Sequence, residues 1–227
     1  MQRGGKARES GSMEDVLQGI EEAIALGSLY PRERLVEDEL MEQFGAKRHV
    51  VRRALLELEA RGMVERRRNV GALVRAYTAR EVREVYVVRE LLETHAIGLI
   101  QPPVDPGLLE ELKALQRRHD AAAEAGDARG TMYANMAFHE AIFALSGNDA
   151  LVEAIRLHAR KTYAMRSITV NSPAILTNAR HEHWEMINAL EAGDIQKVAD
   201  VARAHLLPSR DAYLTRVADK ESLAASS

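Results

Sequence analysis

The 227-residue chain contains no cysteine. This absence excludes disulfide bonds and thiolate metal ligands. No apolar run approaches the roughly 20 residues that a helix needs to span a membrane. The strand-like alternation of apolar and polar residues is also missing from the part of the chain after Thr78. These absences favour a cytoplasmic protein without a membrane partner, whose larger part is helical.

The chain also lacks a strong overall charge, since its formal net charge is −3. This balance hides a local excess of cations at residues 46–75, AKRHVVRRALLELEARGMVERRRNVGALVR. Nine Lys and Arg stand there against three Glu, which leaves a charge of +6, whereas residues 77–227 carry −4. Clustered cations on one small surface are the electrostatic footprint of a protein that binds duplex DNA.

The spacing of apolar residues predicts three helices before Gly62, at about 13–26, 35–44 and 48–60. Gly27, Gly45 and Gly62 end them. Residues 63–67 and 72–76 can then pair as two strands around the turn at 68–71, where Asn69 and Gly71 supply turn chemistry. Three helices and a two-stranded wing predict a winged helix-turn-helix domain at residues 12–76.

The third helix of such a domain enters the major groove of DNA. Arg48 and Arg52 lie one turn apart on its polar face, with His49 and Arg53 in a parallel row. A planar guanidinium can bind phosphate or the O6/N7 edge of guanine with two hydrogen bonds. The alternative for single arginines is a solvated helix face, which we favour for Arg61 and Arg75. The candidate DNA-binding residues are therefore Lys47, Arg48, His49, Arg52, Arg53, Arg67, Arg68 and Gly71.

Helix caps divide the remaining chain. Thr78-Ala-Arg-Glu81 is a capping box, and Asp105-Pro106 and Ser172-Pro173 are caps followed by proline at the first helical position. Asp127, Asp149 and Asp194 begin three more helices, the last running to about Val217. Six helices with short connections predict an antiparallel all-helical bundle at residues 77–218.

Three of the eight histidines are expected to face the inside of this bundle: His139, His183 and His205. His183 and His205 lie at similar distances before and after Gly193, so an antiparallel pair of helices brings them level. Three imidazoles with one oxygen donor are a common ligand set for zinc and other divalent transition metals. The alternative is that each is a hydrogen-bonded core residue. Arg89 and Arg166 are candidate partners for an anionic effector, or else surface and ion-pair residues.

The pattern Ile20…Gly27-Ser-Leu-Tyr-Pro31…Leu35…Leu40…Phe44-Gly45-Ala-Lys-Arg48…Val51-Arg52-Arg-Ala54-Leu55…Leu58-Glu59…Gly62-Met-Val64…Gly71…Val74 resembles the GntR family of bacterial transcription regulators. The helical part resembles the effector domain called FCD, so that the likeness covers about residues 12–215. The resemblance implies DNA contacts at Arg48 and Arg52 and a wing tip at Gly71. It also implies a metal site at Asn135, His139, His183 and His205.

The chain departs from the family pattern at several of these positions. Asn135 replaces the Asp of the metal motif, and a neutral amide oxygen is a weaker ligand than a carboxylate. Lys47, Val50 and Arg53 replace Ser, Pro and Glu, which makes the recognition helix more basic and changes the expected operator preference. Arg32 stands where the family often has Gly.

These features together predict a homodimeric, ligand-responsive repressor of a palindromic double-stranded DNA operator. A small carboxylate metabolite at a metal site, with zinc or nickel bound, is the expected effector. One alternative is the same kind of regulator with a metal-free pocket. The other is a metal-dependent enzyme, which we disfavour because no carboxylate is spaced to act as its general acid or base.

Overall fold

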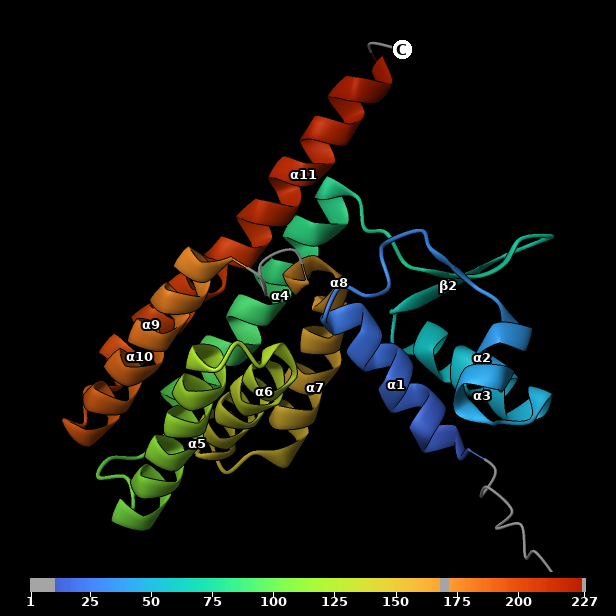
Figure 1. Cartoon of the computed structure of the whole chain (residues 1–227). Helices are drawn as coiled ribbons and strands as arrows, with labels where there is room; N and C mark the ends of the chain where they lie inside the picture. The colour runs from blue at the N-terminus through green and yellow to red at the C-terminus, as the bar shows by residue number, and fades with distance from the viewer. Residues whose placement is uncertain (1–10, 168–171, 226–227) are drawn as a thin grey trace, which may run out of the picture. The chain divides into compact units, whose positions relative to one another are not determined.

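The computed structural model of the chain describes residues 11–167 and 172–225. The chain divides between Ala76 and Tyr77 into two compact units, which are described separately below. Figure 1 labels the elements of both units. Within the described residues, no helix is long and apolar enough to cross a membrane.

The first unit contains three helices, α1 (Met13–Ala25), α2 (Glu37–Phe44) and α3 (Arg48–Ala60). Ser12 caps α1 in a capping box with Asp15. Gly45 ends α2 with a left-handed backbone, φ 60°, and Lys47 then takes the N-cap position of α3. This tight turn packs α2 against α3 and is the helix-turn-helix that the sequence predicts.

The wing has one strand more than predicted. Strand β2 (Val64–Arg67) pairs with β3 (Gly71–Val74), and β1 (Arg34–Leu35) pairs with the other side of β3, all antiparallel. The two predicted wing strands are confirmed, and β1 was not predicted because two residues are too few to show an alternating pattern. The two residues before this strand also bond to Val74 of β3, from Arg32 N to Val74 O (2.8 Å) and from Val74 N to Glu33 O (2.9 Å).

The second unit is helical throughout its described residues. Its elements are α4 (Ala79–Gly98), α5 (Pro106–Glu124), α6 (Ala128–Ala144), α7 (Asp149–Lys161), α8 (Tyr163–Arg166), α9 (Pro173–Glu191), α10 (Ile195–His205) and α11 (Leu207–Ala225). The predicted caps at Thr78, Asp105, Asp127 and Asp194 each accept a backbone hydrogen bond from the first turn of their helix.

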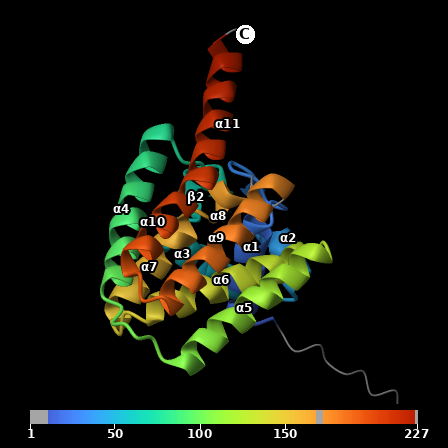
Figure 2. The ribbon, with the colours of Figure 1, turned by 90° about the vertical axis from the view of Figure 1, so that its left-hand side faces the viewer.

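Two predictions about these helices are wrong. The short helix α8 was not predicted, and the single last helix is broken at Leu206 into α10 and α11. Pro208 lies in the first turn of α11 and lacks the backbone N–H that a continuous helix would need there. In both views of the ribbon α11 extends beyond the other helices of this unit (Figure 1, Figure 2).

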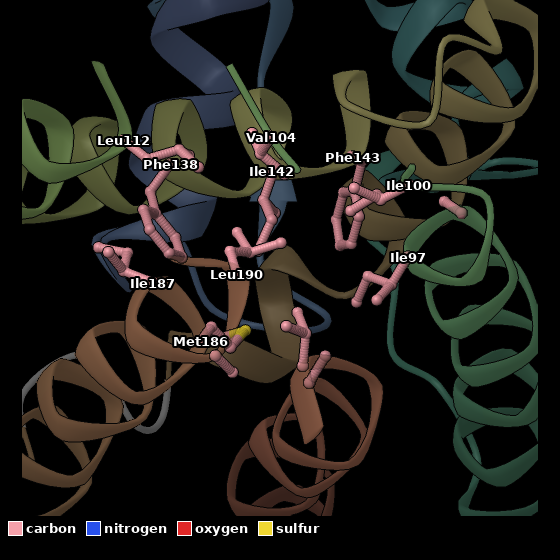
Figure 3. Close-up of a cluster of buried hydrophobic side chains, with 14 of the residues drawn as sticks. Ile97, Ile100, Val104, Leu112, Phe138, Ile142, Phe143, Met186, Ile187 and Leu190 are labelled. Atoms are coloured by element: carbon pink, nitrogen blue, oxygen red, sulfur yellow. The ribbon is translucent and has the colours of Figure 1, made fainter. Parts of the chain in front are cut away.

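The core of the second unit lies between α4, α5, α6, α9 and α10. Figure 3 shows Phe138 of α6 between Leu112 of α5 and Ile187 of α9, and Ile142 of α6 between Val104 and Leu190 of α9. Phe138, Ile142 and Ile187 are fully buried. Truncating a side chain such as Phe138 to alanine costs roughly 3–5 kcal/mol in a core of this kind. A closely packed core of this type can hold neighbouring polar side chains at fixed positions.

Candidate functional site

The polar face of α3 is exposed along its whole first half. Val51, Ala54, Leu55 and Leu58 are buried against the first unit, whereas the candidate DNA-binding side chains at positions 47, 48, 49, 52 and 53 are exposed. Arg67, Arg68 and Gly71 in the wing are exposed as well. The amphipathic pattern of α3 thus places the basic residues on the side that can meet a groove of DNA.

Two acidic residues at the start of α2 contact these arginines. Glu37 accepts two hydrogen bonds from Nε of Arg52, at 3.0 and 2.9 Å, and Asp38 accepts one from Nη2 of Arg48. A groove of about 370 Å³ runs from Arg52, Glu37 and Asp38 to the wing residues Asn69–Ala72. Contacts of two carboxylates, Glu37 and Asp38, with the arginines of the basic face were not predicted from the sequence.

The second unit brings the three predicted histidines together. His139 of α6, His183 of α9 and His205 at the end of α10 each offer a ring nitrogen, and these atoms lie within 4.8 Å of one another. The Nε2 atoms of His139 and His205 are 3.1 Å apart. We call these three residues the histidine triad.

The ring of His183 is oriented by a chain of hydrogen bonds. Asp120 accepts from Gln116 Nε2 (2.8 Å), Arg180 Nε (2.7 Å) and Trp184 Nε1 (2.9 Å). Because a carboxylate only accepts, Gln116 must turn its amide nitrogen to Asp120 and its oxygen to Nδ1 of His183, 2.7 Å away. His183 therefore carries its hydrogen on Nδ1 and directs the lone pair of Nε2 toward the triad.

His205 is held in the same way by a charged partner. Its Nδ1 lies 2.7 Å from Oε2 of Glu182, and both side chains are largely buried. With Nδ1 donating to Glu182, the Nε2 lone pair of His205 faces His139. Both imidazoles are thus fixed with a coordinating nitrogen directed inward.

Two rings of the triad, those of His139 and His183, are also kept neutral. Burial, followed by the positive charge that His205 would carry, lowers the pKa of His139 and of His183 well below the ordinary value. A fourth ring, His119, lies 5.2 Å from His183 between ring centroids, and burial lowers its pKa to about 4. Neutral imidazoles are the form that binds a metal ion.

One further observation supports a divalent transition metal at the triad. Nε2 of His183 is buried and has no hydrogen-bond partner among the described residues, which is costly unless a ligand uses its lone pair. Asn135 lies one helical turn before His139 and is also buried, and its Nδ2 has no partner in the described part of the chain. His139, His183 and His205 would hold the ion, with the Asn135 amide as the fourth candidate.

A small cavity of about 70 Å³ borders the triad. His139 lines it together with Met136, Phe143 and Tyr163, and so do both candidate effector residues, Arg89 and Arg166. Arg89 is buried and bonded through Nε to Glu93 (2.8 Å) and through Nη1 to Thr162 (3.1 Å). Burial lowers the pKa of Arg89, but the charge and hydrogen bond of Glu93 together with the nearby Tyr86 and Tyr163 raise it, and the net shift is upward. For Arg166, burial and then the charge of Arg89 lower the pKa.

Sequence reasoning did not find Gln116, His119, Asp120 or Glu182. A signal for the first two exists on α5, where Gln116 and His119 continue the apolar stripe of Leu109, Leu112 and Leu115 with polar side chains. A buried polar residue on an apolar stripe indicates a partner elsewhere. Asp120 and Glu182 give no such signal in the sequence.

Comparison with known families identifies this architecture. Residues 13–74 match the bacterial regulatory proteins of the gntR family, and residues 84–207 match the FCD domain. The chain belongs to the GntR family. It is a DNA-binding transcriptional regulator and not an enzyme, and the resemblance seen in its sequence is confirmed.

Two GntR-type relatives extend over most of the chain. One, from Paenarthrobacter nicotinovorans, is named as a probable transcriptional repressor of a D-xylose utilization operon. It is 30% identical over 185 residues, 80% of this chain and 79% of the relative. The regulator McbR of Escherichia coli K12 is 27% identical over 195 residues, covering 84% and 87% of the two chains.

Solved structures of GntR regulators share the fold. The structure of Escherichia coli McbR has a TM-score of 0.77 at 25% identity and covers 90% of this chain and 97% of its own. A GntR-type regulator of Rhodococcus sp. RHA1 has a TM-score of 0.76 at 21% identity, with coverage of 89% and 97%. The second likeness concerns the fold alone.

Proposed function

We propose that this chain is a homodimeric repressor that leaves its operator when a small carboxylate binds in the second unit beside a zinc or nickel ion. One observation carries the proposal: His139 belongs to the triad and also lines the cavity that Arg89 and Arg166 line. A bound ion would supply open coordination positions for carboxylate oxygens. Arg166 and Arg89, which also pairs with Glu93, would both supply positive charge to the same anion.

The first unit would read the operator in the cytoplasm. Its exposed polar and basic residues on α3, which are Lys47, Arg48, His49, Arg52 and Arg53, would bind phosphates and base edges. Arg67 and Arg68 of the wing would bind beside them, at the wing tip formed by Gly71. This assignment rests on the exposure of each of these residues in α3 and in the wing. A palindromic operator requires two such heads related by twofold symmetry.

The homodimer would use the outer face of α4. Val87 (57% exposed), Val88 (36%) and Leu91 (66%) form an apolar stripe there, which we call the α4 stripe. Glu84 lies before the stripe and His95 after it, and both are exposed. An antiparallel second copy of α4 would bury the stripe and bring Glu84 of each helix near His95 of the other, so the face is complementary to itself.

Release from DNA would follow from a population shift. An effector that binds one arrangement of the helical unit more tightly favours that arrangement by its difference in affinity. If the favoured arrangement spaces the two heads differently from the operator half-sites, affinity for DNA falls. Reciprocity then requires that operator DNA weakens effector binding by the same factor.

Elemental mass spectrometry of untagged protein tests the metal. Wild type is compared with His183→Ala and with His181→Ala, whose side chain is exposed two residues away. We expect about one equivalent per chain in wild type and in His181→Ala, and loss in His183→Ala. No metal in any of them after addition of Zn²⁺ or Ni²⁺ would instead favour a metal-free pocket.

A carboxylate screen then tests sensing. Operator binding is measured with small carboxylates for wild type and for Arg166→Gln. We expect at least one acid to weaken operator binding by wild type and to have less effect on the variant. If no carboxylate changes operator affinity, the sensing part of the proposal is wrong while the DNA-binding part stands.

A further inference from the structure

The first turn of α2 carries three consecutive carboxylates, Glu37, Asp38 and Glu39. They differ in what they contact. Glu37 bonds Arg52 and also lies 3.6 Å from Nη1 of Arg48, whereas Asp38 bonds Nη2 of Arg48. Glu39 is exposed and forms no ion pair within the described residues. Only one of the three therefore contacts Arg52.

The atoms that form the Glu37–Arg52 contact determine which part of the guanidinium is left to bind DNA. Both hydrogen bonds come from Nε of Arg52, at 3.0 and 2.9 Å. The Nη1 and Nη2 groups take no part in these two bonds, and a guanidinium can use them to bind guanine O6 and N7 or a phosphate with two bonds. Glu37 thus holds Arg52 by Nε and leaves Nη1 and Nη2 to bind DNA.

The burial of the two side chains agrees with this arrangement. The Glu37 side chain is 27% exposed and that of Arg52 is 59% exposed. The carboxylate is therefore the better fixed of the two and anchors a side chain that would otherwise sample many rotamers in water. An exposed pair of this kind adds little to folding stability, because solvent screens it. Its effect is on orientation.

We propose that Glu37 is a positioning residue for DNA reading, which fixes the guanidinium of Arg52 so that its end faces a base edge. This inference rests on the proposed role of α3 as the recognition helix. A carboxylate near the phosphates also disfavours binding wherever Arg52 finds no matching base. Glu37 therefore increases the discrimination between operator and other DNA more than it increases affinity.

The test uses a duplex that wild-type protein selects from a random-sequence library. The dissociation constant for this duplex and for a shuffled duplex is measured at the same salt concentration for wild type, Glu37→Gln and Glu39→Gln. Both variants lose one negative charge from the same helical turn, but only Glu37 contacts Arg52. Thermal unfolding of each variant checks that the fold is unchanged.

We expect Glu37→Gln to lose about tenfold of the discrimination between the two duplexes, since the bidentate base contact of Arg52 is then no longer held in position. Binding to the shuffled duplex is expected to be unchanged or tighter, and Glu39→Gln is expected to keep the wild-type ratio. In an Arg52→Ala background, Glu37→Gln is expected to have no further effect on the ratio, because the two residues act through one contact.

Equal ratios for Glu37→Gln and Glu39→Gln would overturn the positioning role, and so would a full effect of Glu37→Gln in the Arg52→Ala background. These results would leave DNA reading by α3 intact. If wild type selects no duplex from the library, the DNA-reading part of the proposed function fails as well, which separates the two failures.

Discussion

At the scale of single residues, Asp120 determines the orientation of His183 without touching it. The carboxylate accepts from Gln116, so the amide oxygen of Gln116 must face Nδ1 of His183. The orientation of one ring thus depends on two polar residues of α5 that pack beside α9. Such indirect partners fix the tautomer and the direction of a metal-binding imidazole.

Replacing Gln116 by Leu removes this acceptor while keeping a side chain of similar size. We expect zinc affinity to fall about 10- to 100-fold, because His183 can then turn or change tautomer. The measurement is a zinc titration in competition with a chromogenic chelator. Gln196→Leu, on the exposed face of α10, is the control and is expected to bind zinc as wild type does. Equal affinities of the two variants would contradict the orienting role.

Asn135→Asp restores the carboxylate that the resemblance places at this position. With zinc present we expect tighter binding, at least about tenfold, because an anionic oxygen is a stronger ligand than an amide. Without metal we expect the variant to be less stable by on the order of 1–3 kcal/mol, since a buried acid is left without a partner. Thermal unfolding with and without zinc measures both effects. A variant that is equally stable in both conditions would place Asn135 outside the site.

The sequence predicts a site residue only where the spacing of apolar residues along one helix shows which way the side chain points. His139, His183 and His205 lie on apolar stripes, so their inward direction follows from helical periodicity. Glu182 and Asp120 lie on partly buried flanks, and their roles depend on which helix packs beside them. The contact between Glu37 and Arg52 likewise joins residues 15 positions apart. Periodicity within one element carries no information about such contacts.

At the scale of elements, local signals fixed most boundaries. Ser12, Thr78, Asp105, Asp127 and Asp194 all cap helices at the predicted residues. The errors have physical causes as well. Strand β1 has two residues and exists through its pairing with β3, and the break at Leu206 depends on a proline that the apolar periodicity passes over. The first error concerns an element that depends on long-range pairing, whereas the second concerns a local signal that the periodicity does not register.

The strand β1 follows a strained turn. Arg32 has φ 76°, in the left-handed region where a residue with a Cβ is disfavoured by roughly 1–2 kcal/mol. Glycine avoids this strain but loses about 0.5–1 kcal/mol of backbone entropy on folding. We therefore expect Arg32→Gly to increase the stability of the first unit by up to about 1 kcal/mol.

Urea unfolding followed by circular dichroism measures this change. Asn69→Gly is the matched comparison, because Asn69 has φ 64° but asparagine tolerates that conformation better than arginine. We expect a smaller gain there. A loss of stability in Arg32→Gly would show that its side chain, and not its backbone, matters at this turn.

At the scale of the whole molecule, the two units have opposite charge. In the proposed function, the basic face of the first unit needs two copies at fixed spacing to read a palindrome, and the acidic helical unit would bind the effector. In the proposed dimer, the α4 stripe is the surface through which the two copies of the chain contact each other. Large apolar side chains that share one exposed helix face indicate a surface that another protein covers.

Leu91→Glu places a charge at the centre of the α4 stripe. In a twofold arrangement each substitution acts twice, so we expect the protein to become monomeric at micromolar concentration, as measured by light scattering after gel filtration. Operator affinity is expected to fall by a factor of about 10² or more, because binding of the second head is no longer intramolecular. Leu108→Glu makes the same change on the exposed face of α5, where Leu108 is 44% exposed, and is expected to leave both properties unchanged. A dimeric Leu91→Glu protein with wild-type operator affinity would move the dimer contact to another surface.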